Sequence, residues 1–583
     1  MTKEKNRKHV APQECEWQRV SGGAGEPTRV QLACSLRTAA GVTDLLAGLS
    51  TSQAQRITAL DLHCTDVLLF ESSLDVGRRK EEGTELLSRF HNLKEMRIES
   101  CKIRYVPSAV LSPLSGLRSL TIRTHNTDWS AMSMEFHRDS FRGLTDLRYL
   151  DLGDNNIWIL PSEIFCPLYN LKELNITQNR LQDISNLGFS DWGNGPTAPG
   201  KSLRALQKLL LHNNRISTVA DRAFVGLSDL QILNLSTNAL TGLPPEMFQS
   251  SRDIKQIYLN NNSLSVLAPG LLEGLDQLQI LDMSFNELTS EWVNRDTFSG
   301  LVRLIVLNLS HNRITKIDAL LFQDLNNLQF LSLEFNNIAR IADGAFSNLK
   351  NLHSLSLAHN NIIEVDTNHF SNLYVLNQLF LDGNRITKVD VRSFENITKL
   401  HDLGLSGNQL SEVPEAIKTL RFLTSLDLGM NRITKVSTNH FEGLDDLYGL
   451  RLVGNKIEKI SKDTFAGIFT NTQPLVWLNV SNNELLWFDY SHIPTNLEWL
   501  DMHENKIERL EDTYGVKETS NVKMLDVSFN KLRNIDEFAF PSSIETVIIN
   551  NNHIEKINPG TFLQKYNLNK VMLYSNKIKT LDV

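Results

Sequence analysis

Residues 328–338 read LQFLSLEFNNI and decide the fold of this chain. Their pattern, L-x-x-L-x-L-x-x-N-x-L, recurs about 21 times between Ile57 and Ile578, at a spacing of about 24 residues. A period of this length is typical of leucine-rich repeats, each of which contributes one short strand. A single repeat cannot bury its apolar face alone, whereas stacked repeats share one continuous core. The pattern therefore predicts a solenoid.

The expected architecture is an α/β leucine-rich-repeat solenoid that curves like a horseshoe. Parallel strands would line its concave face, and irregular or short helical segments would form its convex side. A second motif, Phe-x-x-Leu, follows many of the strands and is predicted to pack inside the convex side. Its phenylalanines are therefore expected to be core residues: Phe298, Phe322, Phe346, Phe370 and Phe441.

The asparagine of the pattern is expected to be structural. The chain turns sharply after each strand, and a buried amide can donate to and accept from backbone groups there. Repeated along the array, these side chains would form a ladder. The slot holds Thr65, Cys101 and His125 in the first three repeats, and asparagine in the 18 that follow: Asn155, Asn179, Asn214, Asn238, Asn262, Asn286, Asn312, Asn336, Asn360, Asn384, Asn408, Asn431, Asn455, Asn483, Asn505, Asn530, Asn552 and Asn576.

The repeat positions divide the chain into three parts. Residues 1–14 are predicted to be a disordered tail, residues 15–56 a cysteine-containing amino-terminal cap, and residues 57–583 the repeat array. Residues 185–202 interrupt the array with a polar stretch rich in Gly and Pro, which predicts a surface loop. The pattern also predicts an array without a C-terminal cap, without a secretory signal and without a membrane span, as expected of a fragment of a longer protein.

The five cysteines all lie in the first third of the chain. Cys15 with Cys34 would close the cap, and Cys64 with Cys101 would join consecutive repeats at their strand ends. This leaves Cys166 outside both pairs. Two bridges favour an oxidising compartment over five buried thiols in a cytosolic protein.

Six N-x-S/T sequons are candidate glycosylation sites. A chain this rich in asparagine would contain about six by chance, so their number decides nothing. The candidate acceptors are Asn175, Asn234, Asn261, Asn308, Asn396 and Asn479.

Composition and motifs favour binding over catalysis. A net charge of −8 argues against a nucleic-acid partner, which usually meets a basic face. The chain has no P-loop, H-E-x-x-H or C-x-x-C motif, so we expect no catalytic residue, metal or cofactor and predict that it is not an enzyme. Histidines at several strand exits are predicted to be surface side chains: His212, His311, His359 and His503.

The candidate contact patch lies near residue 490. Trp477 and Trp499 occupy the same column of successive repeats, so their side chains should be neighbours on strands about 4.8 Å apart. Exposed tryptophans are enriched at binding hot spots, although packing under a neighbouring loop would explain them equally well. Arg451, Asp501 and Tyr490 complete the predicted patch.

Several segments depart from the repeat consensus: Arg123–Asn126 with Trp129, Asn155–Trp158, Ile164–Cys166, Asn179–Asp183, Leu447–Leu452, Phe488–Tyr490 and Leu497–His503. In these segments the chain resembles the arthropod Toll-type receptors, specifically the long-ectodomain branch that includes Tollo and 18-wheeler. The resemblance spans nearly the whole chain. Relatives place a partner for Cys166 in the loop after repeat five, and that loop here has no cysteine. Repeats are also missing here near residues 201 and 470.

This resemblance implies a single-pass receptor at the plasma membrane, with the present chain on the extracellular side. Further repeats, cysteine-rich caps, a membrane helix and a cytoplasmic signalling domain would follow. The chain would bind a protein ligand, a cell-surface receptor or a second copy of itself, in innate immune, developmental or adhesion signalling. Two alternatives remain: a secreted or adhesion-type leucine-rich-repeat protein without a signalling domain, and an intracellular scaffold.

Overall fold

The structure is a computed structural model. It describes residues 14–20, 29–66, 69–74, 86–126, 133–185, 187, 203–221, 223–462, 464–465, 475–536 and 539–579. The predicted tail at residues 1–14 and the predicted loop at 185–202 fall almost entirely outside the described residues.

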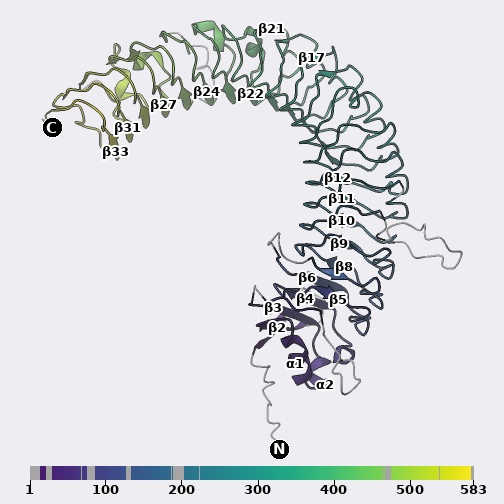
Figure 1. Cartoon of the computed structure of the whole chain (residues 1–583). Helices are drawn as coiled ribbons and strands as arrows, with labels where there is room; N and C mark the ends of the chain where they lie inside the picture. The colour runs from purple at the N-terminus through teal and green to yellow at the C-terminus, as the bar shows by residue number, and fades with distance from the viewer. Residues whose placement is uncertain are drawn as a thin grey trace, which may run out of the picture. The chain divides into compact units, whose positions relative to one another are not determined.

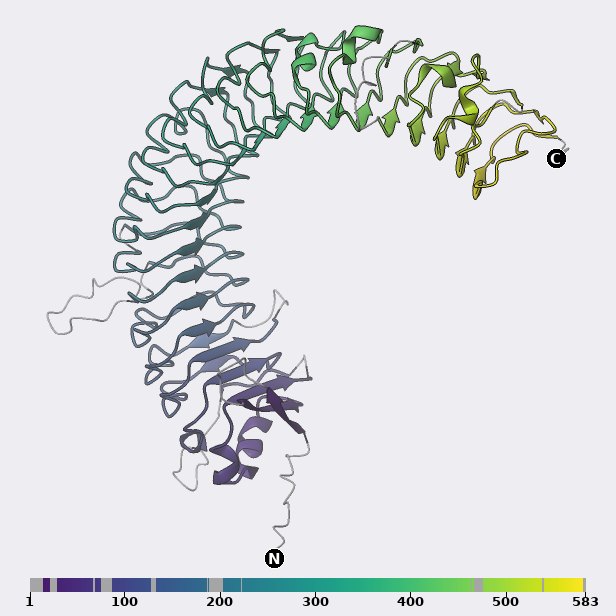
Figure 2. The ribbon, with the colours of Figure 1, turned by 180° about the vertical axis from the view of Figure 1, so that it is seen from behind.

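The chain divides into two compact units. Unit 1 comprises residues 1–288 and 296–304, and unit 2 comprises residues 289–295 and 305–583. In each unit the chain winds into successive repeats, and each repeat contributes one strand to a parallel sheet (Figures 1 and 2). The predicted fold class is thereby confirmed.

Unit 1 contains the only two α-helices among the described residues, α1 (Gly41–Gly48) and α2 (Thr51–Ala54). A short 3-10 helix, η1, covers Leu86–Arg89. The strands of unit 1 are β1 (Cys15–Val20), β2 (Arg29–Leu36), β3 (Ala59–Cys64), β4 (Glu95–Glu99), β5 (Tyr105–Val106), β6 (Ser119–Arg123), β7 (Glu135–Phe136), β8 (Tyr149–Asp151), β9 (Glu173–Asn175), β10 (Lys208–Leu210), β11 (Ile232–Asn234), β12 (Gln256–Tyr258) and β13 (Ile280–Asp282).

The first strands lie where the sequence predicts an amino-terminal cap. β1 pairs antiparallel with β2, and β2 pairs parallel with β3 at the start of the repeat sheet. A disulfide joins Cys15 to Cys34, which face each other across β1 and β2. A second disulfide joins Cys64 to Cys101, so both bridges have the partners that the sequence predicts.

Removing the Cys64–Cys101 bridge is expected to destabilise unit 1. The bridge closes a separation of 37 residues, and losing a bridge of that span costs about 2–4 kcal/mol because the unfolded chain gains entropy. The double variant Cys64→Ser/Cys101→Ser should therefore unfold at lower urea concentration. An unchanged urea midpoint, with the oxidised wild type as reference, would contradict this expectation.

Unit 2 has two rows of strands. Its main row is β14 (Val306–Asn308), β16 (Phe330–Ser332), β18 (Ser354–Ser356), β20 (Gln378–Phe380), β22 (Asp402–Gly404), β23 (Ser425–Asp427), β24 (Gly449–Arg451), β25 (Trp477–Asn479), β27 (Trp499–Asp501), β29 (Met524–Asp526), β31 (Thr546–Ile548) and β33 (Lys570–Met572). Its second row consists of pairs of two-residue strands on the flank: β15 (Lys316–Ile317) with β17 (Arg340–Ile341), β19 (Glu364–Val365) with β21 (Lys388–Val389), β26 (Phe488–Asp489) with β28 (Leu510–Glu511), and β30 (Asn534–Ile535) with β32 (Lys556–Ile557). Short 3-10 helices form η2 (Glu415–Thr419), η3 (Thr438–Phe441), η5 (Tyr490–His492) and η6 (Val516–Glu518).

Most main-row strands bury their middle residue and leave their two outer residues at least partly exposed, as strand alternation requires. Behind the strands, the phenylalanines of the Phe-x-x-Leu motif are buried and pack ring on ring. The rings of Phe322 and Phe346 lie 5.9 Å apart and nearly parallel. These residues are therefore core, as predicted.

The asparagine ladder provides hydrogen-bond partners for buried backbone groups of neighbouring repeats. Asn336 is buried, and its Oδ1 accepts from the amide of Ile314 in the preceding repeat at 3.0 Å. Its Nδ2 donates to the carbonyls of Leu309 at 2.9 Å and Leu333 at 3.1 Å. Equivalent contacts recur at other asparagine slots of unit 2, for example Asn360 and Asn384, so the structural interpretation of this residue is confirmed.

In unit 1, a buried lysine donates hydrogen bonds to backbone carbonyls in the repeats that precede the ladder. The ammonium of Lys102 donates to the carbonyls of Thr124 at 2.7 Å and His125 at 2.8 Å. Burial lowers the pKa of Lys102. The ladder itself begins one repeat later, where Asn155 Oδ1 accepts from the amide of Thr124.

None of the helices in the described part of the chain has the length and apolar character that a membrane crossing requires.

Candidate protein-binding surface

The outward-facing side chains of the main-row strands in unit 2 form what we call the strand face. Its residues are the first and third of each strand, together with the side chains at the strand exits. Because neighbouring strands run parallel and in register, equivalent residues of successive repeats form columns across this face.

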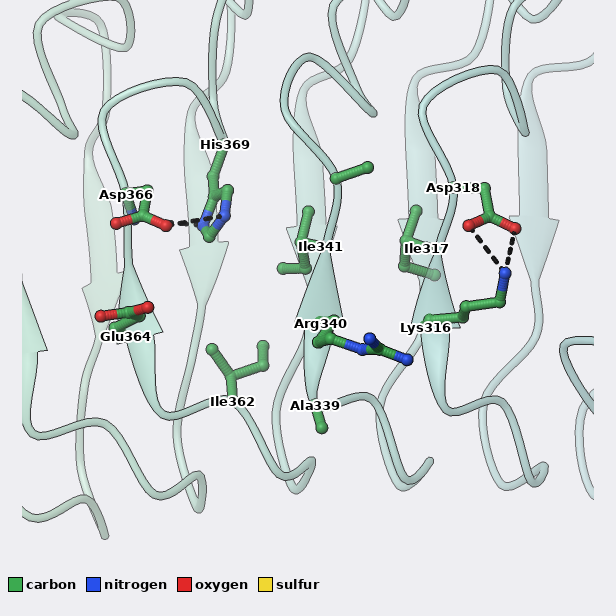
Figure 3. Close-up of a pocket in the computed structure, with 11 residues that line it drawn as sticks. Lys316, Ile317, Asp318, Ala339, Arg340, Ile341, Ile362, Glu364, Asp366 and His369 are labelled. Atoms are coloured by element: carbon green, nitrogen blue, oxygen red, sulfur yellow. Dashed lines mark hydrogen bonds and ion pairs between the residues drawn. The ribbon is translucent and has the colours of Figure 1, made fainter.

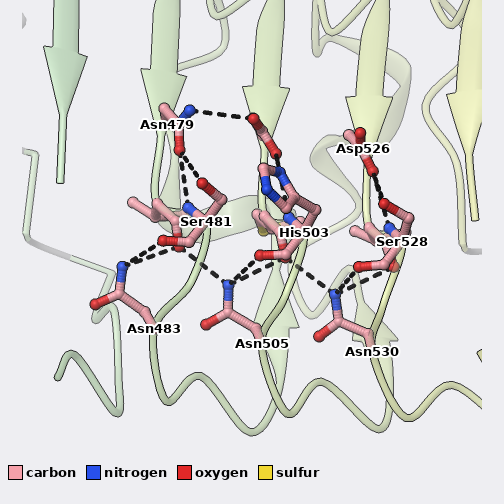
Figure 4. A network of polar contacts seen from close by, with 12 residues as sticks. Asn479, Ser481, Asn483, His503, Asn505, Asp526, Ser528 and Asn530 are labelled. Carbon is pink, nitrogen blue, oxygen red and sulfur yellow. Dashed lines mark hydrogen bonds and ion pairs between the residues drawn. The ribbon is translucent and has the colours of Figure 1, made fainter. Parts of the chain in front are cut away.

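Polar side chains at the ends of several strands accept hydrogen bonds from the backbone of the turn that follows. Asn479 Oδ1 accepts from the amide of Ser481 at 2.9 Å, and Asp526 Oδ1 accepts from the amide of Ser528 at the same distance. Figure 4 shows these turn contacts beside the asparagine ladder. A hydroxyl two residues after the strand end strengthens the turn, and Asn-x-Ser is also a glycosylation sequon.

The structure separates the six predicted glycosylation acceptors into two groups. Asn175, Asn234, Asn308 and Asn479 end β9, β11, β14 and β25, and their Oδ1 atoms accept from the amide two residues later. Asn261 is exposed at a strand exit, and Asn396 lies in a turn behind the strands. Turn chemistry therefore explains four of the sequons, and glycosylation at all six stays a prediction.

One group on the strand face could offer three ligand atoms to a cation. Ligand atoms of Asp501, His503 and Asp526 lie within 4.8 Å of one another. Asp501 Oδ1 contacts His503 Nδ1 at 2.6 Å, and its Oδ2 accepts from Asn479. Both aspartates also cap turns of the kind that Asn479 forms, so backbone turns account for the cluster.

Four strands of unit 2 carry the predicted tryptophan patch. The register pairs Gly449 with Trp477, Trp477 with Trp499, and Trp499 with Met524. Trp499 is 50% exposed, whereas Trp477 is half-buried. The indole of Trp477 lies against Gly449, where an added Cβ would come within 3.4 Å of its Cε3. The structure therefore places both tryptophans in one apolar column of the strand face.

Arg451 joins this column to the charged residues beside it. Its guanidinium carbon lies 5.9 Å from the ring centroid of Trp477, within the range of a cation–π contact. Its Nε lies 3.4 Å from Asp427 Oδ2 on the neighbouring strand. Arg451 and Trp477 therefore form one contiguous surface with Trp499.

Tyr490 does not belong to the patch, and that part of the sequence prediction is wrong. It is only 1% exposed, and its hydroxyl donates to the carbonyl of Ala539 at 2.7 Å. Phe488 is also buried, with its ring at 86° to that of Tyr490. Between β25 and β27 the chain turns into the core at β26 and η5, so Phe488 and Tyr490 face inward although they lie between the two tryptophans in sequence.

Sequence reasoning missed an aromatic stack elsewhere on the strand face. The rings of His311 and Phe335 lie 4.3 Å apart, and those of Phe335 and His359 lie 4.2 Å apart, both pairs nearly parallel. The signal was present in the sequence, because each of these residues directly precedes a ladder asparagine in three successive repeats. The sequence prediction treated each histidine as a separate surface side chain and did not include Phe335, so the stack was not predicted.

A hollow of about 410 Å³ lies on the flank of unit 2, between the β15–β17 and β19–β21 pairs. Four of its polar residues are held in local contacts, as Figure 3 shows for Lys316 with Asp318 and His369 with Asp366. His369 Nδ1 accepts from the amide of Asp366, and burial lowers the pKa of His369, which keeps the ring neutral. These contacts account for four of the six ionisable side chains that line the hollow.

Comparison with known protein families identifies the class. A family model described as "Leucine rich repeat" matches residues 135–192, 204–288 and 291–485, and one described as "BspA type Leucine rich repeat region (6 copies)" matches residues 495–582. The chain belongs to the leucine-rich repeat family.

Within that family, the resemblance to arthropod Toll-type receptors is confirmed. The chain is 44% identical to Toll-like receptor 7 of Drosophila melanogaster over 92% of its own length and 41% of that receptor. It is 28% identical to human Podocan-like protein 1 over 39% of its length and 40% of that protein. The chain thus spans about two fifths of these curated relatives.

Solved structures agree on the fold. In the structure of the Drosophila Toll–Spatzle complex, the matched chain superposes with a TM-score of 0.61 at 21% identity, over 90% of this chain and 69% of that one. The plant peptide hormone receptor RGFR1 in complex with RGF2 gives a TM-score of 0.53 at 17% identity, over 94% and 93%. At these identities the likeness shows the repeat fold alone.

Proposed function

We propose that this chain is the extracellular ligand-recognition region of a Toll-like transmembrane receptor. In this role the chain binds a protein ligand or a partner receptor through the strand face of unit 2. The observation that carries the proposal is the apolar column of Trp477, Trp499 and Met524 with Arg451 beside it. Large exposed aromatic side chains next to an arginine are the typical composition of a protein-binding hot spot.

The comparisons support a protein as the occupant. The Toll chain that shares this fold was solved in a complex with Spatzle, and RGFR1 was solved with RGF2. The disulfides of unit 1 suit the oxidising extracellular side of the plasma membrane. The proposed role is binding rather than catalysis, and signalling would belong to other parts of the full-length protein.

A second candidate function is that of a secreted or adhesion-type protein, which the similarity to Podocan-like protein 1 favours. The two candidate functions predict different domains in the full-length protein. A full-length transcript that encodes a membrane helix and a signalling domain would support the receptor. Matrix or adhesion modules in their place would support the second candidate and overturn the first.

The double variant Trp477→Ala/Trp499→Ala is expected to weaken partner binding at least tenfold. Hot-spot aromatic residues typically contribute about 2 kcal/mol or more each, and both side chains leave the same column. The purified chain would first be tested against an array of secreted and cell-surface ectodomains, including a second copy of itself. Dissociation constants of wild type and variant would then be measured for the partner found.

A matched control replaces two exposed aromatic residues outside the strand face, Tyr374→Ala/Tyr566→Ala. It should bind as the wild type does, and both variants should keep the wild-type melting temperature to within a few degrees. Binding that survives the loss of both tryptophans would remove this patch from the proposal.

A further inference from the structure

A second surface on the strand face of unit 2 has a different chemistry from the tryptophan column. A hollow of about 470 Å³ opens over β14, β16, β18 and β20, and we call it the basin. Small side chains form its floor, among them Ser332, Ser354 and Ser356. Phe330 and Phe380 stand at its sides, and Phe330 is 47% exposed. A run of small residues between large aromatic ones creates a recess that is open to solvent.

The aromatic stack forms one edge of the basin. Phe335 lies between the rings of His311 and His359 and is 42% exposed. The stack ends on Gly383, where an added Cβ would come within 2.4 Å of His359 Nδ1. The absence of a side chain at position 383 therefore gives the imidazole of His359 its place.

These aromatic residues occupy a strained backbone conformation. His311, Phe335 and His359 have φ between 51° and 53°, in the left-handed region that glycine and asparagine adopt more easily. The same position holds glycine in the next two repeats, at Gly383 and Gly407. The residue before the ladder asparagine adopts the same conformation in other repeats, Phe285 and Phe529 among them, so the left-handed turn belongs to the repeat and brings the rings of successive repeats side by side.

Two carboxylates line the basin, and each can accept more hydrogen bonds than the contacts described next provide. Glu334 Oε2 accepts from the hydroxyl of Ser356 at 3.1 Å, and Asp382 Oδ1 accepts from the amide of Ser406 at 2.9 Å. Asp382 lies over Gly404, where an added Cβ would come within 2.1 Å of its Oδ2. Gly404 has no side chain to cap the turn that follows its own strand, and Asp382 supplies the cap from the repeat before.

The capping contact alone does not explain the charge of Asp382. An asparagine could accept the same hydrogen bond, as the strand-end Asn479 does for Ser481. Burial raises the pKa of Asp382, so the fold disfavours the ionised form. None of the described residues that line the basin is a lysine or arginine that could neutralise it. A cation supplied from outside would do so.

We propose that the basin binds a lysine or arginine side chain from a basic segment of a protein partner. Glu334 and Asp382 pair with the cationic group, and the exposed rings of Phe330 and Phe335 cover its aliphatic stem. Cation–π and carboxylate contacts at one place select a basic side chain over an apolar or acidic one. The inference rests on the proposed function only in taking the occupant to be a protein.

The test uses a fluorescent peptide, acetyl-GKRGKRG-amide, and the whole chain. The double variant Glu334→Gln/Asp382→Asn keeps both hydrogen-bond acceptors and removes both charges. We expect it to raise the dissociation constant of the peptide at least tenfold in fluorescence anisotropy. Phe335→Ala should raise the dissociation constant about threefold or more. Coupling of the bound peptide with a carbodiimide should join its lysines to Glu334 or Asp382.

A matched control removes two exposed charges away from the basin, Glu412→Gln/Glu415→Gln. It should change the dissociation constant less than twofold. An equal loss in both double variants would mean attraction by the net charge alone and would overturn the proposal, as would unchanged binding by Glu334→Gln/Asp382→Asn. The peptide titration needs no natural partner, so its failure is distinguishable from failure of the receptor proposal.

Discussion

Replacing Asn336 with alanine is expected to lower the free energy of unfolding of unit 2 by about 3 kcal/mol. The side chain supplies the hydrogen-bond partners of the Ile314 amide and of the Leu309 and Leu333 carbonyls, all within the core. Each buried backbone group left without a partner costs about 1–3 kcal/mol, and partial relaxation reduces the sum. Urea denaturation followed by circular dichroism would measure the loss.

The neighbouring residue provides the control. Asn337 is exposed and carries the same amide, so Asn337→Ala should change the free energy of unfolding by less than about 0.5 kcal/mol. In Asn336→Ala the Ile314 amide should also exchange its hydrogen faster than in Asn337→Ala. Equal stability of the two variants would show that water replaces the amide, and the ladder would then lose its stabilising role.

Replacing Tyr490 with alanine is expected to cost about 3–5 kcal/mol, because it removes a fully buried aromatic side chain and leaves a cavity. Tyr490→Phe keeps the ring but leaves the Ala539 carbonyl without its donor, which costs about 1–1.5 kcal/mol. Burial raises the pKa of Tyr490, so the hydroxyl remains a donor at neutral pH. Thermal and urea unfolding would rank the three proteins.

Tyr514 is the matched control for this series, because it is 62% exposed and its loss should change stability little. The folded Tyr490→Phe variant should bind partners as tightly as the wild type, since its hydroxyl does not reach the surface. Weaker binding at unchanged stability would return Tyr490 to the contact patch.

Much of the fold follows from the repeat alone. A period of about 24 residues with one strand per repeat sets which residues pair, so the register of Trp477 with Trp499 could be predicted without coordinates. The same logic predicts the partners of Cys64 and Cys101 at adjacent strand ends. These predictions succeed because each repeat contacts mainly its neighbours, and sequence spacing then translates directly into distance.

The candidate site was only partly predictable. Column geometry gives the neighbours of Trp477 and Trp499, but not that the indole of Trp477 lies over Gly449 within reach of Arg451. Between strands the repeat imposes no alternation, so closeness in sequence to Trp477 and Trp499 misplaced Tyr490 on the surface. Inside the turns, burial depends on the path of the backbone.

The sequence by itself determined the family, the strand register, the ladder of asparagines and the disulfide partners, because these depend on spacing between equivalent positions. Only the tertiary structure decided which side chains share a surface. The stack of His311, Phe335 and His359 depends on a left-handed backbone at three successive positions, and the setting of Asp382 depends on the missing side chain of Gly404. Such features depend on contacts between side chains of neighbouring repeats. A residue without a side chain in one repeat leaves space that a side chain of the next or preceding repeat fills.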